Sequence, residues 1–173
     1  MTHNRIDHEI IAGLVEPHST VLDLGCGSGE LLELLVSQKH VQGIGIERDL
    51  EMVKNSLSRG IPVLQRNLDN GLSNYQDRRF DVVILSLTLQ ALKNPHIALR
   101  EMLRVGKKAI VSFPNFGHIS IRLDLLFGGR MPKNKFLPYE WYDTPNIHFC
   151  SISDFENFCN KEGFKITRRI YLK

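Results

Sequence analysis

Residues 21–29 read Val-Leu-Asp-Leu-Gly-Cys-Gly-Ser-Gly, and this stretch decides the fold of the chain. Its apolar first half predicts a buried strand over residues 20–24, and the amphipathic pattern that follows predicts a helix from Ser28 to about Gln38. Glycines between a strand and a helix let a ligand approach the free N–H groups at the start of the helix. The stretch therefore predicts an α/β unit with a ligand site at its turn, although glycine also serves such turns for steric reasons alone.

Two acidic residues make the ligand more specific. Asp23 lies one residue inside the end of the first strand, where it suits the amine of an amino-acid ligand, held directly or through water. Glu47 follows a second predicted strand over residues 41–46. A carboxylate at that position accepts hydrogen bonds from both ribose hydroxyls of an adenosine. Together the two residues predict a ligand that joins an adenosine to an amino acid.

A nicotinamide dinucleotide would share Glu47, so an oxidoreductase is the weaker alternative. Dinucleotide sites more often show G-x-G-x-x-G, whereas here Glu30 directly follows Gly29. A carboxylate in the first turn of the helix repels the negative charge of a pyrophosphate but is compatible with a cationic sulfonium. The sequence therefore favours S-adenosylmethionine, or S-adenosylhomocysteine, as the cofactor.

Outward from this stretch, short apolar runs alternate with amphipathic segments, as in a parallel sheet covered by helices. The expected strands cover residues 20–24, 41–46, 62–65, 81–85, 108–112 and 164–172. The expected helices cover about residues 5–15 and 28–38, a segment opened by Asp49 and closed near Gly60, a segment opened by Asn94-Pro95 and closed at Gly106, and a last segment opened by a capping box of Ser153 and Glu156 and closed at Gly163. This pattern predicts a Rossmann-like, doubly wound, mostly parallel sheet.

The motifs resemble those of known proteins. The run at 21–29, Gly-Ile-Glu at 45–47 and Phe-Asp-Val-Val-Ile-Leu at 80–85 resemble class I S-adenosylmethionine-dependent methyltransferases over about residues 20–113. Three further runs, at 85–90, 112–118 and 137–148, are similar to the MetW family over nearly the whole chain. The resemblance implies a role in bacterial methionine biosynthesis beside a homoserine O-acyltransferase of the MetX type.

The resemblance also implies a set of cofactor-binding residues. In the wider methyltransferase family, an Asp in the loop after the third strand accepts from the adenine amino group. Asn67 takes that place here, so either Asn67 is the acceptor, or Asp69 is, or Asp69 is only a solvated loop acid. The expected cofactor-binding residues are Asp23, Gly25, Cys26, Gly27, Gly29, Glu47, Asn67, Leu68, Asp69 and Ser86.

The catalytic residues are not identified by the sequence. Methyl transfer needs mainly alignment of donor and acceptor, and a general base only when the acceptor is protonated. His118 and His148 are candidates for such a base, and each also fits an ordinary structural or surface histidine. Residues 86–90 contain no Asn-Pro-Pro-Tyr-like clamp. Two hypotheses follow: an accessory or regulatory subunit that binds S-adenosylmethionine, or a catalytic small-molecule methyltransferase.

Length and composition set the broad class. At 173 residues we expect one methyltransferase-like domain, with a cofactor-binding core at 1–113, a lid or interface insertion at 114–150, and a final helix and strand at 151–173. The shortened C-terminal end lacks the usual last hairpin and predicts an edge that a partner covers.

Three cysteines without a CxxC spacing argue against disulfides and zinc, and we expect no metal. Without a signal peptide or a run of about 20 apolar residues, we expect a cytoplasmic protein that binds no membrane.

The last third of the chain carries the excess positive charge. Residues 130–173 hold 8 basic and 5 acidic residues, together with the aromatic residues Tyr139, Trp141 and Tyr142. The aromatic run predicts a lid packed on the protein's own core, an acceptor pocket or a protein interface. Without a dense basic run, nucleic-acid binding is not favoured, and a homodimer stays open.

Overall fold

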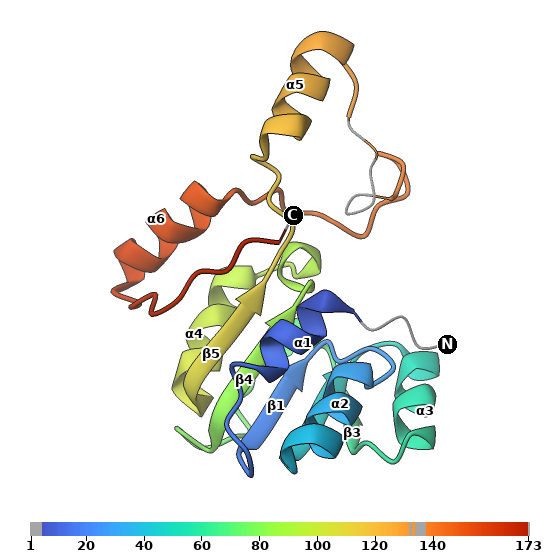
Figure 1. Cartoon of the computed structure of the whole chain (residues 1–173), viewed down its shortest axis with the longest axis vertical. Coiled ribbons are helices and arrows are strands. Elements are labelled where there is room, and N and C mark those ends of the chain that lie inside the picture. Colours follow the sequence, from blue (N-terminus) through green and yellow to red (C-terminus); the bar gives the residue numbers. More distant parts are fainter. Residues whose placement is uncertain (1–4, 132, 134–137, 173) are drawn as a thin grey trace. The chain divides into compact units, whose positions relative to one another are not determined.

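The computed structural model describes residues 5–131, 133 and 138–172. The chain divides into two compact units, Met1–Ser112 and Phe113–Lys173 (Figure 1). The division falls beside the expected end of the cofactor-binding core at residue 113. Leu137, the first residue of the run at 137–148, lies outside the described residues.

The first unit is built on a sheet of five parallel strands in the order β3-β2-β1-β4-β5. The strands are β1 (Thr20–Leu24), β2 (Gln42–Glu47), β3 (Val63–Gln65), β4 (Phe80–Ser86) and β5 (Gly106–Ser112). The central strands β1 and β4 are almost wholly buried, as the continuous apolar runs in their sequences predict. The predicted α/β fold is confirmed.

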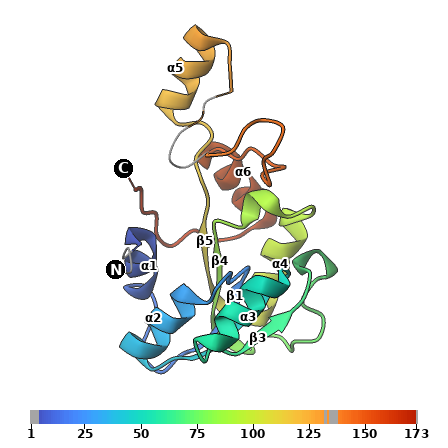
Figure 2. The same cartoon turned by 90° about the vertical axis from the view of Figure 1, so that its right-hand side faces the viewer.

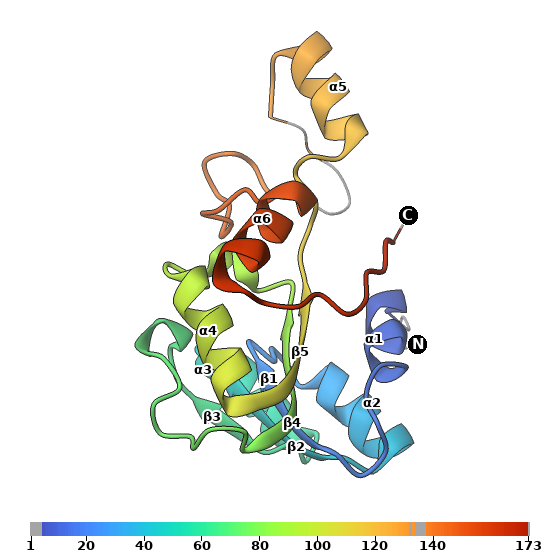
Figure 3. The same cartoon turned by 90° about the vertical axis from the view of Figure 1, so that its left-hand side faces the viewer.

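Helices cover both faces of this sheet. They are α1 (Ile6–Ala12), α2 (Glu30–Lys39), α3 (Leu50–Ser58) and α4 (Pro95–Val105), with 3₁₀ turns η1 (Leu68–Asn70) and η2 (Leu89–Ala91). Figures 2 and 3 show α4 on the opposite face of the sheet from α1 and α2. As predicted, Asp49 caps α3 by accepting from the N–H of Met52, and Pro95 occupies the first turn of α4.

The strand order reverses between β1 and β4. From β1 the chain runs outward through β2 to β3, then returns to the other side of β1 as β4 and continues to β5. In open α/β sheets, ligands bind at the carboxyl ends of the strands where the order reverses. The turn after β1 therefore lies where such a sheet binds its ligand.

The second unit contains helices α5 (Ile119–Gly128) and α6 (Ile152–Glu162). Aromatic pairs hold its segments together: Phe113 lies against Phe155, with ring centroids 4.9 Å apart, and Phe116 against Phe149 at 4.8 Å. The N–H of Phe116 also donates to the carbonyl of Cys150 at 3.2 Å.

Two expectations for the C-terminal end are wrong. The capping box of α6 is formed by Ser151 and Asp154, not by Ser153 and Glu156, because the helix begins at Ile152, two residues before the expected start. Residues 164–172 form no strand. Their side chains include the exposed Ile170, Tyr171 and Leu172, and a strand needs a neighbour to pair its backbone groups. Among the described residues, every helix is too short or too polar to cross a bilayer.

Candidate functional site

Three glycines hold the turn after β1 in a left-handed conformation. Gly25, Gly27 and Gly29 have φ of 73°, 55° and 79°, which residues with a Cβ rarely adopt. The N–H groups of Gly25 and Cys26 both donate to the carbonyl of Ile46, at 2.8 and 3.1 Å, and tie the turn to β2. Gly29 is the N-cap of α2 and provides no side chain for its first N–H groups. The N–H groups of the three glycines and of Cys26 are used within the protein, and the first N–H groups of α2 are the ones left without a side-chain cap.

The surroundings of these glycines differ. A Cβ at Gly25 would lie 2.6 Å from Oγ1 of Thr88, and one at Gly29 would lie 2.5 Å from Oγ of Ser56. A Cβ at Gly27 would meet no atom within 4 Å. Packing within the protein therefore explains the glycines at 25 and 29, whereas Gly27 faces open space that a ligand can use.

Glu47 ends β2, and its carboxylate reaches back to the glycine turn. Oε2 accepts from the N–H of Gly27 at 3.0 Å, while Oε1 accepts from the N–H groups of Arg48 and Asp49 at 2.7 and 2.9 Å. A carboxylate has about four lone-pair positions, so these three bonds leave acceptor capacity on Oε2. The structure thus brings Glu47 and Gly27 together in an arrangement that fits a ribose.

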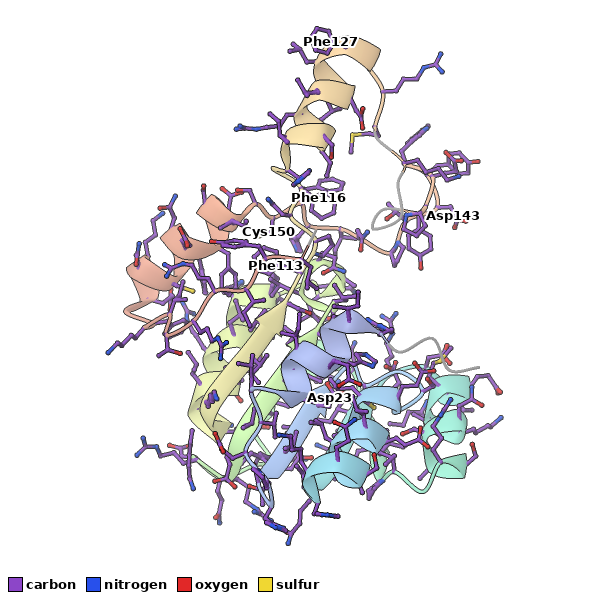
Figure 4. The ribbon with its side chains drawn as sticks, viewed as in Figure 1. Asp23, Phe113, Phe116, Phe127, Asp143 and Cys150 are labelled. Atoms are coloured by element: carbon purple, nitrogen blue, oxygen red, sulfur yellow. The ribbon has the colours of Figure 1, made fainter. Side chains whose placement is uncertain are left out.

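Asp23 is the buried acid of the site (Figure 4). It lies on β1 between Gly45 of β2 and Ile84 of β4, and only 2% of its surface is exposed. Its carboxyl group accepts no hydrogen bond from the residues that the structure describes. Burial, and then the charge of Glu47, raise the pKa of Asp23 to about 7, while Arg5 acts in the opposite direction. A buried carboxyl without a partner suits a ligand cation, which would favour its ionised form.

Cys26 contributes its backbone rather than its thiol. A Cβ at Gly45 would collide with Sγ of Cys26, so the absence of a side chain at Gly45 makes room for the thiol. Burial, with the nearby charges of Asp23 and Glu47, raises the pKa of the Cys26 thiol to about 12. The thiol is therefore neutral near pH 7 and does not act as a nucleophile.

The expected adenine contacts lie in η1, after β3. The side-chain oxygen of Asn67 accepts from the N–H of Asp69 at 3.0 Å and caps this turn. Oδ1 of Asp69 accepts from the N–H groups of Lys93 and Asn94, at 2.9 and 3.3 Å. Asp69 is therefore not a solvated loop acid, because it ties η1 to the start of α4. Which of Asn67 and Asp69 meets the adenine stays a prediction, as does the role of the half-buried Leu68.

The end of β4 also approaches the glycine turn. Oγ of Ser86 lies 3.0 Å from Oγ of Ser112, at the neighbouring ends of β4 and β5. The next residue, Leu87, has φ of 51°, and the side-chain amide of Gln90 donates to its carbonyl at 2.7 Å. Thr88 closes against Gly25. The sequence does not predict Thr88 as a neighbour of the turn, because its placement depends on a left-handed Leu87 that no sequence pattern signals.

A hollow of about 390 Å³ lies between α2 and α3, next to the glycine turn, and none of the expected site residues lines it. Arg59 is bound there to Glu33 at 2.6 Å and to Glu30 at 3.5 Å. The lining residues are Ser28, Glu30, Met52, Asn55, Ser58 and Arg59. The hollow therefore reaches the glycine turn at Ser28 but is lined by neither Asp23 nor Glu47.

The two candidate bases belong to the second unit. Nδ1 of His118 lies 2.8 Å from Oγ of Ser120 and accepts from the N–H of Ser120 at 3.3 Å, so this side chain caps α5. His148 is exposed in the loop before α6. In the described ranges, no three His, Cys, Asp or Glu side chains are grouped so as to hold a metal ion.

Comparison with known proteins gives the relatives of this chain. The chain matches the family model described as methionine biosynthesis protein MetW over residues 5–173. It is 36% identical, over 176 aligned positions, to the bifunctional methionine biosynthesis protein MetXA/MetW of Rhodopirellula baltica. That match covers 96% of this chain, which spans only 28% of the length of the relative.

Solved structures resemble the fold. An S-adenosylmethionine-dependent methyltransferase from Thermotoga maritima superposes with a TM-score of 0.68 and 21% identity, over 92% of this chain and 70% of its own. The plantazolicin methyltransferase solved in complex with S-adenosylhomocysteine gives a TM-score of 0.63 and 21% identity, over 83% of this chain and 55% of its own. These likenesses show a methyltransferase-type fold. The family match over residues 5–173 leads to a further conclusion: the chain belongs to the MetW family of methionine biosynthesis proteins.

Proposed function

We propose that the glycine turn after β1 binds S-adenosylmethionine or S-adenosylhomocysteine. The observation that carries this proposal is the pair of acids at the turn: Glu47 against the N–H of Gly27, and Asp23 buried without a hydrogen bond. Glu47 would accept from the ribose hydroxyls, and Asp23 would face the ammonium of the amino-acid part, directly or through water. When bound, adenosylmethionine supplies an activated methyl group.

The features around the turn agree with a cation better than with a pyrophosphate. Three carboxyl groups lie at or beside it, on Asp23, Glu30 and Glu47. Glu30 begins α2, where a phosphate would otherwise meet the helix N-terminus. Arg59 pairs with Glu30 at 3.5 Å, so Asp23 and Glu47 are the acids left to face a sulfonium and an ammonium group.

Calorimetry tests the cofactor assignment. Wild-type protein is titrated with S-adenosylmethionine, S-adenosylhomocysteine, NAD and NADPH. We expect binding of the first two and none of the dinucleotides. Glu47→Ala should weaken that binding, whereas Glu51→Ala should not, because Glu51 is an exposed acid of α3 paired with Lys54. Tight NADPH binding by the wild type would overturn the proposal.

The proposal extends to a partner. The protein acts in methionine biosynthesis as an accessory or regulatory subunit of a homoserine O-acyltransferase of the MetX type. The relative that carries MetXA and MetW in one chain supports this association. Adenosylmethionine is made from methionine, so its binding would report the output of the pathway. Co-purification with the acyltransferase, with and without adenosylmethionine, tests the association, and its absence in both conditions would contradict it.

A second candidate is a small-molecule methyltransferase. One observation favours it: the left-handed Leu87, 43% exposed, follows β4 directly beside the glycine turn, a conformation that often marks functional sites. Incubation with adenosylmethionine and a bacterial metabolite extract, with S-adenosylhomocysteine as the measured product, tests this activity. Product formed only in the presence of extract would support it.

A further inference from the structure

Helix α5 carries an apolar face that its own unit leaves exposed. Ile119, Leu123, Leu126 and Phe127 follow the i, i+4, i+7, i+8 spacing that places side chains on one face of a helix. Their exposed fractions are 59%, 43%, 73% and 82%. Figure 4 shows Phe127 at the end of α5 remote from Phe116. We call these four residues the α5 face.

Few contacts other than those available to the α5 face stabilise this helix. Ile121 is its one buried residue, and His118 caps its first turn. A helix of 10 residues is marginal in water, since most helices in proteins are stabilised by packing an apolar face. The α5 face is therefore in the state expected of a helix that packs against another surface.

We infer that α5 is a docking helix whose face inserts into a groove on the homoserine O-acyltransferase. The inference rests on the proposed function and adds the surface to it. In helix-in-groove recognition, apolar anchors at i, i+4 and i+7 enter a hydrophobic groove. The α5 face provides such anchors, and Phe127 and Leu126 are the most exposed of them.

A relative in which MetW and MetXA are fused points to the partner of the α5 face. In Rhodopirellula baltica the MetW region, matched over 96% of this chain, shares one polypeptide with MetXA. A covalent link keeps two proteins at high effective concentration, so the fusion supports an association between the MetW and MetXA regions. The exposed Arg122 and Asp124 of α5 border the two sides of this face, so a matching groove would carry charges of both signs at its rim.

The test is the affinity of the full-length chain for the homoserine O-acyltransferase of the same organism, measured by surface plasmon resonance. Leu126→Asp/Phe127→Asp should weaken binding by at least about 30-fold, the usual loss at an interface anchor. Leu57→Asp is the matched control, because Leu57 is an apolar residue of α3 that is 54% exposed. It should change the affinity by less than about twofold, as expected away from a hot spot.

Two further measurements separate the outcomes. Leu126→Ala keeps helix propensity, so its weaker binding cannot come from loss of the helix. Adenosylmethionine binding should be equal in all these proteins. If the α5 variants bind the acyltransferase like wild type, the inference is overturned while the proposed function stands. If the wild type does not bind it at all, the partner half of the proposal fails as well. If light scattering shows a wild-type dimer that Leu126→Asp/Phe127→Asp converts to monomer, with acyltransferase binding intact, the face belongs to a second copy.

Discussion

The backbone N–H of Gly27 donates a 3.0 Å hydrogen bond to Oε2 of Glu47. This bond joins the turn after β1 to the end of β2. The remaining acceptor capacity of the carboxylate is what a ribose would use. Glu47 therefore both shapes the turn and is the expected nucleoside contact.

Glu47→Ala should weaken adenosylmethionine binding by about 1.5 to 3 kcal/mol, the value of hydrogen bonds to a charged group. Calorimetry measures the change. Glu47→Arg should create no preference for NADPH, because the positions around it do not suit a dinucleotide. An unchanged affinity in Glu47→Ala would show that the carboxylate serves only the turn.

Gly27→Val should abolish cofactor binding and leave most of the fold intact. A Cβ at position 27 meets no protein atom, so its side chain would enter only the space that a ligand uses. The φ of 55° adds strain on the order of 1–2 kcal/mol. Gly25→Val is the contrasting variant: its Cβ collides with Thr88 and should lower the melting temperature further. Wild-type affinity in a folded Gly27→Val protein would mean that the glycine serves only the turn.

Asp23→Asn should raise stability at pH 8. The pKa of Asp23 is about 7 in the folded protein, compared with about 3.9 in an unfolded chain. The folded state binds this proton more tightly, so wild-type stability falls as the pH rises from about 4 to about 7. Asparagine removes that loss, which a pKa difference of about 3 makes on the order of 4 kcal/mol at pH 8 and close to none at pH 4. Urea unfolding at the two pH values measures the difference, and an equal gain at both would contradict this origin.

Asp23 should also make ligand binding depend on pH. An ammonium group favours the ionised carboxyl, so wild-type affinity for adenosylmethionine should fall by about tenfold per pH unit below pH 7. Asp23→Asn should bind more weakly and lose this dependence. Calorimetry between pH 5.5 and 8 would decide, and a flat wild-type profile would place the ammonium away from Asp23.

Alanine variants of Asn67 and Asp69 should differ in their effects on stability and on adenosylmethionine binding. Asp69→Ala removes the acceptor for two backbone N–H groups at the start of α4 and should cost about 1–3 kcal/mol of unfolding free energy. If Asn67 is the adenine acceptor, Asn67→Ala should weaken adenosylmethionine binding more than Asp69→Ala does. The reverse order, measured by calorimetry, would identify Asp69 as the acceptor.

Trp141→Ala should cost at least about 2 kcal/mol of binding to the acyltransferase, the usual loss at a hot spot. Trp141 is 75% exposed and lies edge-on to Tyr142 at 5.5 Å, so truncation removes contact area without opening a core. Adenosylmethionine affinity should change by less than about 0.5 kcal/mol, as for independent sites. Tyr171→Ala, an exposed aromatic of the C-terminal segment, is the control. If the complex persists and methylation of a metabolite is lost instead, the aromatic run is an acceptor pocket.

The sequence by itself determined which strands and helices follow one another along the chain in the first unit. Local signals are sufficient to predict these elements. Continuous apolar runs indicate buried central strands, Asp49 caps α3, and the glycine turn precedes α2. Where local signals compete, they mislead. Ser151 and Ser153 are both suitable N-cap residues. In the structure Ser151 is the N-cap, and its hydroxyl accepts from the N–H of Asp154. The strand expected at 164–172 failed because strand formation depends on a neighbour that the local sequence does not specify.

Only the tertiary structure decided what each residue of the site does. The three glycines are alike in sequence, but contacts with Thr88 and Ser56, both distant along the chain, assign two of them to packing. Asp69 joins η1 to the start of α4, because the backbone N–H groups of Lys93 and Asn94 donate to its carboxylate. The raised pKa of Asp23 depends on burial and on Glu47, which belongs to another strand. The physical reason is common to all: packing space and electrostatic environment are set by residues far apart in sequence, whereas propensity and capping act within one turn.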